Sequence, residues 1–183
     1  AMWLAACLAG CAGHNPGGRA SPAVVAATGW TEDWEYAGHA GKLIRTPSYR
    51  LFTTATDGEL VGQMPEFLEA AMERYTTAFR PLPRPVLRLD TFLKGDRAQW
   101  QSLTRQVRGK EAATYLRIER GGFASGGRAL LWSIGRRDTL AIAAHEGWHQ
   151  YTQRAFRQEL PAWLEEGVAV YMEGFVPDPV DPA

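Results

Sequence analysis

Cysteine is almost absent from this chain, and its scarcity limits the chemistry that the protein can perform. Among 183 residues there are two cysteines, Cys7 and Cys11. Because both lie in the first eleven positions, the rest of the chain offers no disulfide, no thiolate ligand and no cysteine nucleophile. A Gly-x-Ser-x-Gly segment is also lacking, which argues against a serine hydrolase built on a sharp strand-to-helix turn.

Long hydrophobic runs and an excess of one charge are lacking too. No segment is apolar over the roughly 18 residues that a membrane-spanning helix needs. The net charge is zero, but residues 80–137 carry 13 basic and 4 acidic side chains, whereas residues 138–183 carry 2 and 8. No nucleic-acid-binding motif accompanies the basic part. We therefore expect a solvated surface that complements the acidic part, and no nucleic-acid partner.

The N-terminal residues have the pattern of an export signal. Residues 1–11 are mostly apolar and close with Leu-Ala-Gly-Cys, which resembles the end of a bacterial lipoprotein signal peptide with Cys11 as the lipidated residue. Because the positively charged start is missing, we expect this segment to be truncated. A short buried helix is the alternative. The lipoprotein interpretation predicts an exported protein that acyl chains hold on the outer membrane or cell surface, facing the periplasm or the exterior.

Composition divides the remainder of the chain into three parts. Residues 12–41 are rich in Gly, Ala and Pro, which predicts a flexible tether whose last aromatic residues pack on the domain. His14 and His39 fall in this part and are expected to be solvated. Residues 42–176 are predicted to form one compact domain. Residues 177–183 are a Pro-rich tail at which the chain could also be truncated.

Hydrophobic periodicity gives a coarse order of elements within the domain. It predicts strands at 49–54, 86–92, 115–118 and 129–134 and helices at 62–79 and 97–107. The glycine-rich residues 121–127 lack the ending of a phosphate-binding loop and are predicted to be a mobile turn. The strand at 129–134 leads into a helix with Asp138 as its N-cap. That strand is either a sheet edge able to bind an extended peptide or an ordinary core strand.

Two histidines spaced for one helix face are the main functional signal. His145 and His149 lie four residues apart, with Glu146 directly after the first. On a helix this spacing stacks both imidazoles one turn apart, while Glu146 can reach a water beside them. Imidazole is a favoured Zn²⁺ ligand, and the mostly apolar flanks make uncoordinated histidines costly. A third ligand is available at Glu165 or Glu166, and helical phase alone does not choose between them.

These residues resemble a known group of enzymes. His-Glu-x-x-His at 145–149, followed by Trp-x-x-Glu-Gly-x-Ala at 163–169, resembles the gluzincin branch of zinc metallopeptidases. The looser layout of residues 49–174 is similar to small bacterial peptidase-MA-like domains of uncharacterised function. The resemblance implies an α+β, zincin-like fold, in which a small mixed β-sheet packs on the active-site helix and a second helix carries the glutamate ligand.

The same resemblance implies a site and an activity. His145, His149 and Glu166 would hold one Zn²⁺, and Glu146 would be the general base that hydrolyses peptide bonds with a metal-activated water. Glu165 would then be a hydrogen-bond partner of a ligand histidine or a solvent-facing residue. We expect a monomer acting on a peptide or protein substrate. A membrane contact is expected through the lipid anchor only.

Two other functions are considered because the sequence places no clear donor for the oxyanion. Related sites use a Tyr or His donor for the developing oxyanion, usually beyond the third ligand. Tyr171 lies there, but a helix of 100° per residue turns it about 140° away from Glu166. Tyr151 is similarly misdirected, and Tyr115 is unplaced. The alternatives are a catalytically inactive binding or scaffold lipoprotein, and a metal hydrolase of a non-peptide cell-envelope substrate.

Overall fold

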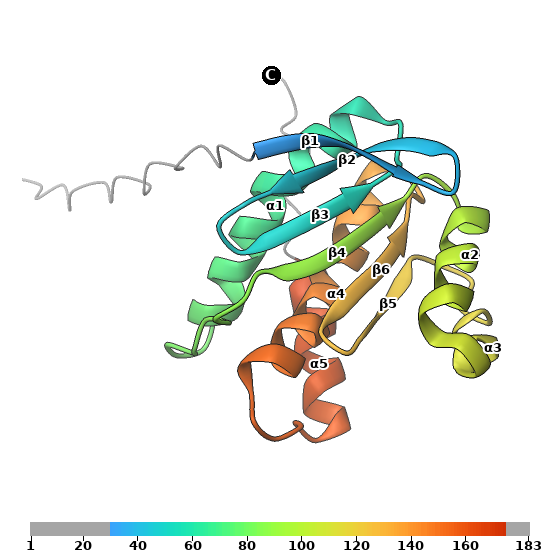
Figure 1. Ribbon diagram of the computed structural model, residues 1–183. Coiled ribbons are helices and arrows are strands. Elements are labelled where there is room, and N and C mark those ends of the chain that lie inside the picture. The colour runs from blue at the N-terminus through green and yellow to red at the C-terminus, as the bar shows by residue number, and fades with distance from the viewer. Residues whose placement is uncertain (1–29, 175–183) are drawn as a thin grey trace, which may run out of the picture.

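The computed structural model describes residues 30–174, which are built on a six-stranded mixed sheet (Figure 1). The expected signal segment with Cys11, the first part of the tether with His14, and the Pro-rich tail all lie outside the described residues. The sheet has the order β1-β2-β3-β4-β6-β5. Its strands are β1 (Trp30–Tyr36), β2 (His39–Arg45), β3 (Tyr49–Thr53), β4 (Leu89–Lys94), β5 (Gly122–Ser125) and β6 (Arg128–Trp132).

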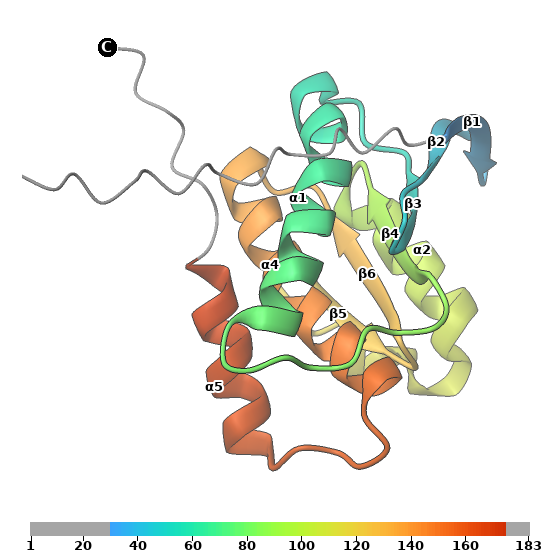
Figure 2. The same cartoon turned by 90° about the vertical axis from the view of Figure 1, so that its left-hand side faces the viewer.

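Helices cover both faces of this sheet. They are α1 (Gly58–Thr77), α2 (Arg97–Arg108), the short turns η1 (Gly109–Glu111) and α3 (Ala112–Tyr115), and then α4 (Arg136–Ala155) and α5 (Ala162–Glu173). Figure 2 shows α1, α4 and α5 on one side of the sheet and α2 on the other. The α+β class and the mixed sheet expected from the sequence are therefore confirmed.

Strand directions follow from the connections. β1, β2 and β3 pair antiparallel through short turns, whereas β3–β4 and β4–β6 are parallel pairs. Parallel neighbours need a long crossover, which α1 supplies between β3 and β4 and which α2 and β5 supply between β4 and β6. β5 returns antiparallel to β6 and ends the sheet.

The larger core lies between the sheet and the helices α1 and α4. Alternate residues of β3 point into it, and Tyr49 and Leu51 are fully buried there. The other face holds a smaller core, in which Trp100 of α2 packs against Phe123 and Trp132. The larger core thus fixes α4, the helix that carries both motif histidines, against the sheet.

Part of the predicted tether is wrong. Residues 30–41 form β1 and the start of β2, and the two strands pair along their full length. The turn between them consists of Ala37 and Gly38, both with positive φ, as a two-residue hairpin turn requires. Small residues were interpreted as a flexible tether, but here they make the turn of a hairpin whose aromatic residues pack on the sheet. His39 lies on this hairpin and is exposed, as expected.

The segment preceding β6 also differs from its prediction. Residues 121–127 were expected to be a mobile turn, yet Gly122–Ser125 form β5. Gly126 and Gly127 both have positive φ and close the β5–β6 hairpin. The edge strand is therefore β5, whereas β6 lies between β4 and β5 and is not an edge.

Three local predictions need smaller corrections. The strand expected at 115–118 is instead the end of α3 and a loop, since its apolar side chains pack on the sheet without joining it. Asp138 is not the N-cap of α4; Gly135 holds that position with φ 95°, and Asp138 lies in the first turn. β4 begins at Leu89, three residues later than expected, because its pairing with β3 starts there. None of the described helices is long and apolar enough to cross a membrane.

Candidate metal centre

The two motif histidines meet on one face of α4. Their Nε2 atoms lie 3.2 Å apart, and the ring centroids are separated by 4.9 Å. This is the arrangement expected for helix positions i and i+4. Both side chains are largely buried, with 16% of His145 and 13% of His149 exposed. The two imidazoles therefore converge on one point just below the surface of the domain.

Helix α5 brings a carboxylate to the same point. One oxygen of Glu166 lies 3.6 Å from Nε2 of His145, and the other lies 3.7 Å from Nε2 of His149. Ligand atoms about 2 Å from a tetrahedral zinc ion are separated from one another by about 3.3 Å. The three side chains have the right atoms at nearly the right spacing. Glu166 is 64% exposed, so one side of the group is open to solvent.

Carboxylates hold the far side of each imidazole. Nδ1–H of His145 donates to Glu173 at 2.6 Å, and Nδ1–H of His149 donates to Glu165 at 3.0 Å. The hydroxyl of Thr152 also donates to Glu165, at 2.6 Å. Because a carboxylate only accepts hydrogen bonds, these contacts keep the protons on Nδ1 and leave lone pairs on both Nε2 atoms.

The result is a group of acceptors without a donor. Two lone pairs and the Glu166 carboxylate face one another within 4.8 Å. Such a group is unfavourable unless a metal cation or an added proton lies between its members. Two imidazole nitrogens and one carboxylate oxygen are a ligand set typical of catalytic zinc, which keeps a fourth position for water. The donor set therefore fits Zn²⁺.

Glu146 lies beside this group on the side of the edge strand. Burial raises the pKa of its carboxyl to about 7, although the nearby His149 and the backbone N–H of Ala124 in β5 lower it. The Glu166 and Glu173 carboxylates raise it further. Glu146 is thus positioned between the histidines and β5, and its proton affinity is near that of a base working at neutral pH.

The raised pKa makes a prediction about the metal-free protein. An unfolded glutamate loses its proton near pH 4.5, whereas the folded protein keeps that proton up to about pH 7. Stability therefore falls as the pH rises between these two values. We expect metal-free Glu146→Gln to be more stable than the wild type at pH 8 by about 2 to 3 kcal/mol and nearly equal at pH 4. Urea denaturation at both pH values measures this.

Glu119→Gln, an exposed control, should show no such pH-dependent gain, and a wild-type stability that is flat between pH 4 and 8 would contradict the assignment.

The contact between His145 and Glu173 makes a second prediction. Glu173 orients the imidazole and makes it a stronger ligand without touching the metal position. Glu173→Ala should weaken zinc binding by about 10- to 100-fold, as measured by competition with a chromophoric chelator. Glu119→Ala is the matched control. Equal zinc affinity in the two variants would show that Glu173 has no positioning role.

A groove leads away from the metal position along the start of α5. It has a volume of about 470 Å³ and is lined by His149, Glu165, Glu166 and the loop between α4 and α5. On the other side of the site, β5 pairs with β6 alone and has no second strand neighbour among residues 30–174. The metal position is therefore flanked by a groove and by a free strand edge.

None of the three tyrosines considered above as oxyanion donors points at the site. The Tyr171 hydroxyl accepts a hydrogen bond from Arg74 at 2.6 Å, and the buried Tyr151 donates to the carbonyl of Pro83. Tyr115 packs against Phe123 on the other face of the sheet. The expectation that Tyr171 and Tyr151 point elsewhere is confirmed.

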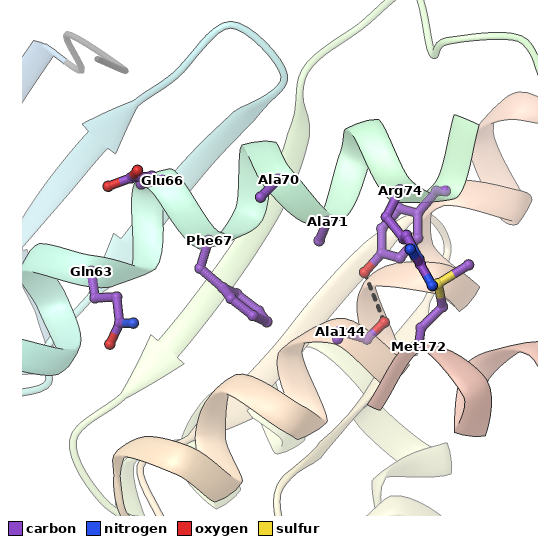
Figure 3. Close-up of a pocket in the computed structure, with 9 residues that line it drawn as sticks. Gln63, Glu66, Phe67, Ala70, Ala71, Arg74, Ala144 and Met172 are labelled. Atoms are coloured by element: carbon purple, nitrogen blue, oxygen red, sulfur yellow. Dashed lines mark hydrogen bonds between the residues drawn. The ribbon is translucent and has the colours of Figure 1, made fainter. Parts of the chain in front are cut away.

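Tyr75 lies behind α4, at one end of a groove of about 230 Å³ between α1, α4 and α5. Its hydroxyl donates to the carbonyl of Ala144 at 2.7 Å, and Figure 3 labels Ala144 among the residues that line this groove. A Cβ at Gly147 would come within 2.5 Å of this hydroxyl. Gly147, between the two histidines, therefore allows α1 to approach α4 closely. The hydrogen bond from Tyr75 of α1 then helps to fix the helix that carries both histidines.

Comparison with known proteins adds no relative. No protein-family model, curated protein or solved structure matches the chain. The structure brings together His145, Glu146, His149, Glu165 and Glu166, all of which the sequence singled out. It adds Glu173, which the sequence did not single out.

Proposed function

We propose that this protein is a zinc-dependent metallopeptidase. The observation that carries the proposal is the convergence of two imidazole nitrogens and one carboxylate, 3.2 to 3.7 Å apart, beside the partly buried Glu146. His145, His149 and Glu166 would hold the ion. The resemblance of residues 145–149 and 163–169 to gluzincins, and hence a zincin-like fold, is part of the same proposal.

Each residue then has a distinct task. Bound zinc supplies a Lewis acid that acidifies a water molecule and polarises a carbonyl. Glu146 accepts a proton from the attacking water and later delivers it to the leaving amine. Its raised pKa suits both transfers, because a group that titrates near neutral pH can accept a proton and release it again. Glu165 and Glu173 hold the imidazoles with their Nε2 atoms directed inward.

The free edge of β5 supports a peptide as the substrate. An extended chain added to this edge would hydrogen-bond through its main chain, which gives affinity with little dependence on sequence. Ala124 of β5 is the residue whose N–H approaches Glu146. A peptide lying along β5 would therefore pass the base.

A binding module is the second candidate, favoured by the positions of the tyrosines. Among the described residues, Tyr75, Tyr151 and Tyr171 all have hydroxyls bonded elsewhere. A site without a donor for the oxyanion would retain zinc and turn over peptides slowly. A third candidate, a metal hydrolase of a cell-envelope substrate, would use the same residues on another bond.

Products of cleavage decide between these functions. The purified, zinc-loaded chain is incubated with an unfolded protein, with peptides and with cell-wall fragments, and the products are identified by mass spectrometry. New peptide termini that disappear with a zinc chelator and return with added zinc would support the peptidase. Cleavage of cell-wall fragments alone would favour the third candidate. Intact substrates with zinc bound would favour the binding module.

A further inference from the structure

A row of charged side chains crosses the sheet on the face opposite α4 and α5. Cross-strand partners lie on the same face of a sheet, and the pairs Arg45–Arg50, Arg50–Asp90 and Asp90–Arg128 join four neighbouring strands. Arg50 lies between Tyr49 and Leu51, which point into the larger core, so the row points the other way. Figure 1 shows α2 on this face, towards the viewer and beside β5 and β6. The side chain of Arg50, in the middle of the row, is 42% exposed.

The row forms one wall of a groove of about 660 Å³. We call it the basic groove; its charged residues are Arg45, Arg50, Arg88, Arg128, Arg154 and Asp90. Arg50 is paired with Asp90 at 2.5 Å and Arg45 with Glu32 at 3.1 Å. Three arginines remain without an acidic partner among the described residues.

The surroundings of these three arginines leave their charge available. Arg88 and Arg154 donate to the carbonyls of Thr46 and Gly126, which orients the guanidinium groups without neutralising them. Arg128 is exposed at the end of the row. Three uncompensated guanidinium groups at one groove attract anions, and arginine matches phosphate groups with paired hydrogen bonds.

Exposed apolar side chains lie beside the basic groove. Val86 and Leu87, on the Pro-rich loop that lines the groove, are 99% and 75% exposed. Trp30 of β1 pairs with Arg45 of the groove and is 71% exposed. A soluble anion would make no use of these side chains, whereas a lipid bilayer would bury them. Tryptophan and aliphatic residues beside arginines are typical of surfaces that lie in the interface of a membrane.

We propose that the basic groove, with Trp30, Val86 and Leu87, docks on the surface of a bilayer that contains anionic phospholipids. The arginines bind lipid phosphates, while the three apolar side chains enter the interfacial layer. The metal position lies on the opposite face, between α4, α5 and β5, and so stays open to solvent when the protein is docked. The proposal does not depend on the metallopeptidase activity.

Vesicle flotation tests this surface. The 183-residue chain is used with Cys7 and Cys11 replaced by serine, so that no acyl chain can contribute. Vesicles of phosphatidylcholine with phosphatidylglycerol should bind the protein more tightly than vesicles of phosphatidylcholine alone, and salt should weaken this binding. Arg128→Ala should lower the partition coefficient about fivefold. The double variant Val86→Ser/Leu87→Ser should lower it about tenfold.

Matched controls separate this proposal from the alternatives. Arg105→Ala removes an exposed arginine on α2, outside the groove, and should bind vesicles as the wild type does. All variants replace exposed side chains, and circular dichroism with thermal unfolding checks that each is folded. Equal binding by Arg105→Ala and Arg128→Ala, or no effect of the Val86/Leu87 pair, would overturn the proposal. Inorganic phosphate or an acidic peptide that displaces the protein while the Val86/Leu87 pair has no effect would point to a soluble anion or a protein, and would also overturn it.

Discussion

Replacing Glu146 with glutamine is expected to leave about one zinc ion per chain and to lower kcat/KM for peptide cleavage by about a thousandfold. Glutamine has nearly the same shape as glutamate but does not accept a proton from the attacking water. Glu146 lies outside the group of three side chains that face the metal position. Its removal therefore separates proton transfer from metal binding, which few other changes at this site would do.

The measurement is a paired one on the same preparation. Zinc is determined by atomic emission, and cleavage of whichever peptide or protein the product analysis shows to be a substrate is followed at saturating zinc. Glu119→Gln makes the same chemical change at an exposed position and should cleave at the wild-type rate. Full activity in a zinc-loaded Glu146→Gln variant would remove Glu146 from the mechanism. Loss of zinc together with activity would make it a ligand instead of a base.

Removal of either of two ligands should empty the metal position. After dialysis against a weak chelator, we expect about one zinc per wild-type chain and close to none in His149→Ala or Glu166→Ala. Each substitution leaves two protein ligands, an imidazole and a carboxylate in His149→Ala and two imidazoles in Glu166→Ala, and neither pair is expected to hold zinc against the chelator. The expected loss in Glu166→Ala follows from its distances of 3.6 and 3.7 Å to the two Nε2 atoms.

Two control variants distinguish the loss of a ligand from other effects of a substitution. His39→Ala removes an exposed histidine on β2 and should keep the metal. Glu165→Ala should weaken zinc binding but still bind one ion at saturating zinc, because Glu165 contacts Nδ1 of His149 and not the metal position. Retention of zinc in Glu166→Ala with loss in Glu165→Ala would exchange the roles of the two glutamates. A folded wild type that binds no zinc would contradict the metal centre itself.

Much of the helical structure could be predicted because its signals are local. The apolar period of residues 62–79 predicted most of α1, and residues 97–107 correspond closely to α2. Both are bounded by strong cues: Asp57 and Asp96 cap the first turns with their side chains. Within α4, spacing alone placed His145 and His149 on one face, since positions i and i+4 are neighbours on any helix.

The strands were predicted less well because a strand is defined by its partner. β5 has four residues, three of which are small, and only its pairing with β6 makes it a strand. The two hairpin turns were the overlooked local signal. Gly126-Gly127 separates two short segments by two glycines, which adopt positive φ without steric cost, and such a pair predicts a hairpin. Ala37-Gly38 is a weaker signal, because Ala37 has φ 50°, which alanine rarely adopts. Composition instead suggested a turn and a tether.

Glu173 is predictable from helix geometry. It lies seven residues after Glu166, which is close to two full turns, so both side chains project from nearly the same face of α5. A glutamate on the ligand face is a candidate partner for an imidazole. Helix geometry does not choose between Glu165 and Glu166, because these adjacent residues both reach a histidine. Only the way α4 crosses α5 places Glu165 at Nδ1 and Glu166 at Nε2 of His149.

The sequence by itself determined the chemistry of this protein: which residue types are present, and which of them share one turn of one helix. Residues 145–149 specify two imidazoles and a carboxylate regardless of the rest of the fold, because helix geometry is local. The tertiary structure decided which of two glutamates faces both imidazoles, which acids fix their tautomers and how deeply Glu146 is buried. It also gathered the arginines of β2, β3 and β6 into one row. These features depend on contacts between segments far apart in the chain, and no periodicity in the sequence encodes them.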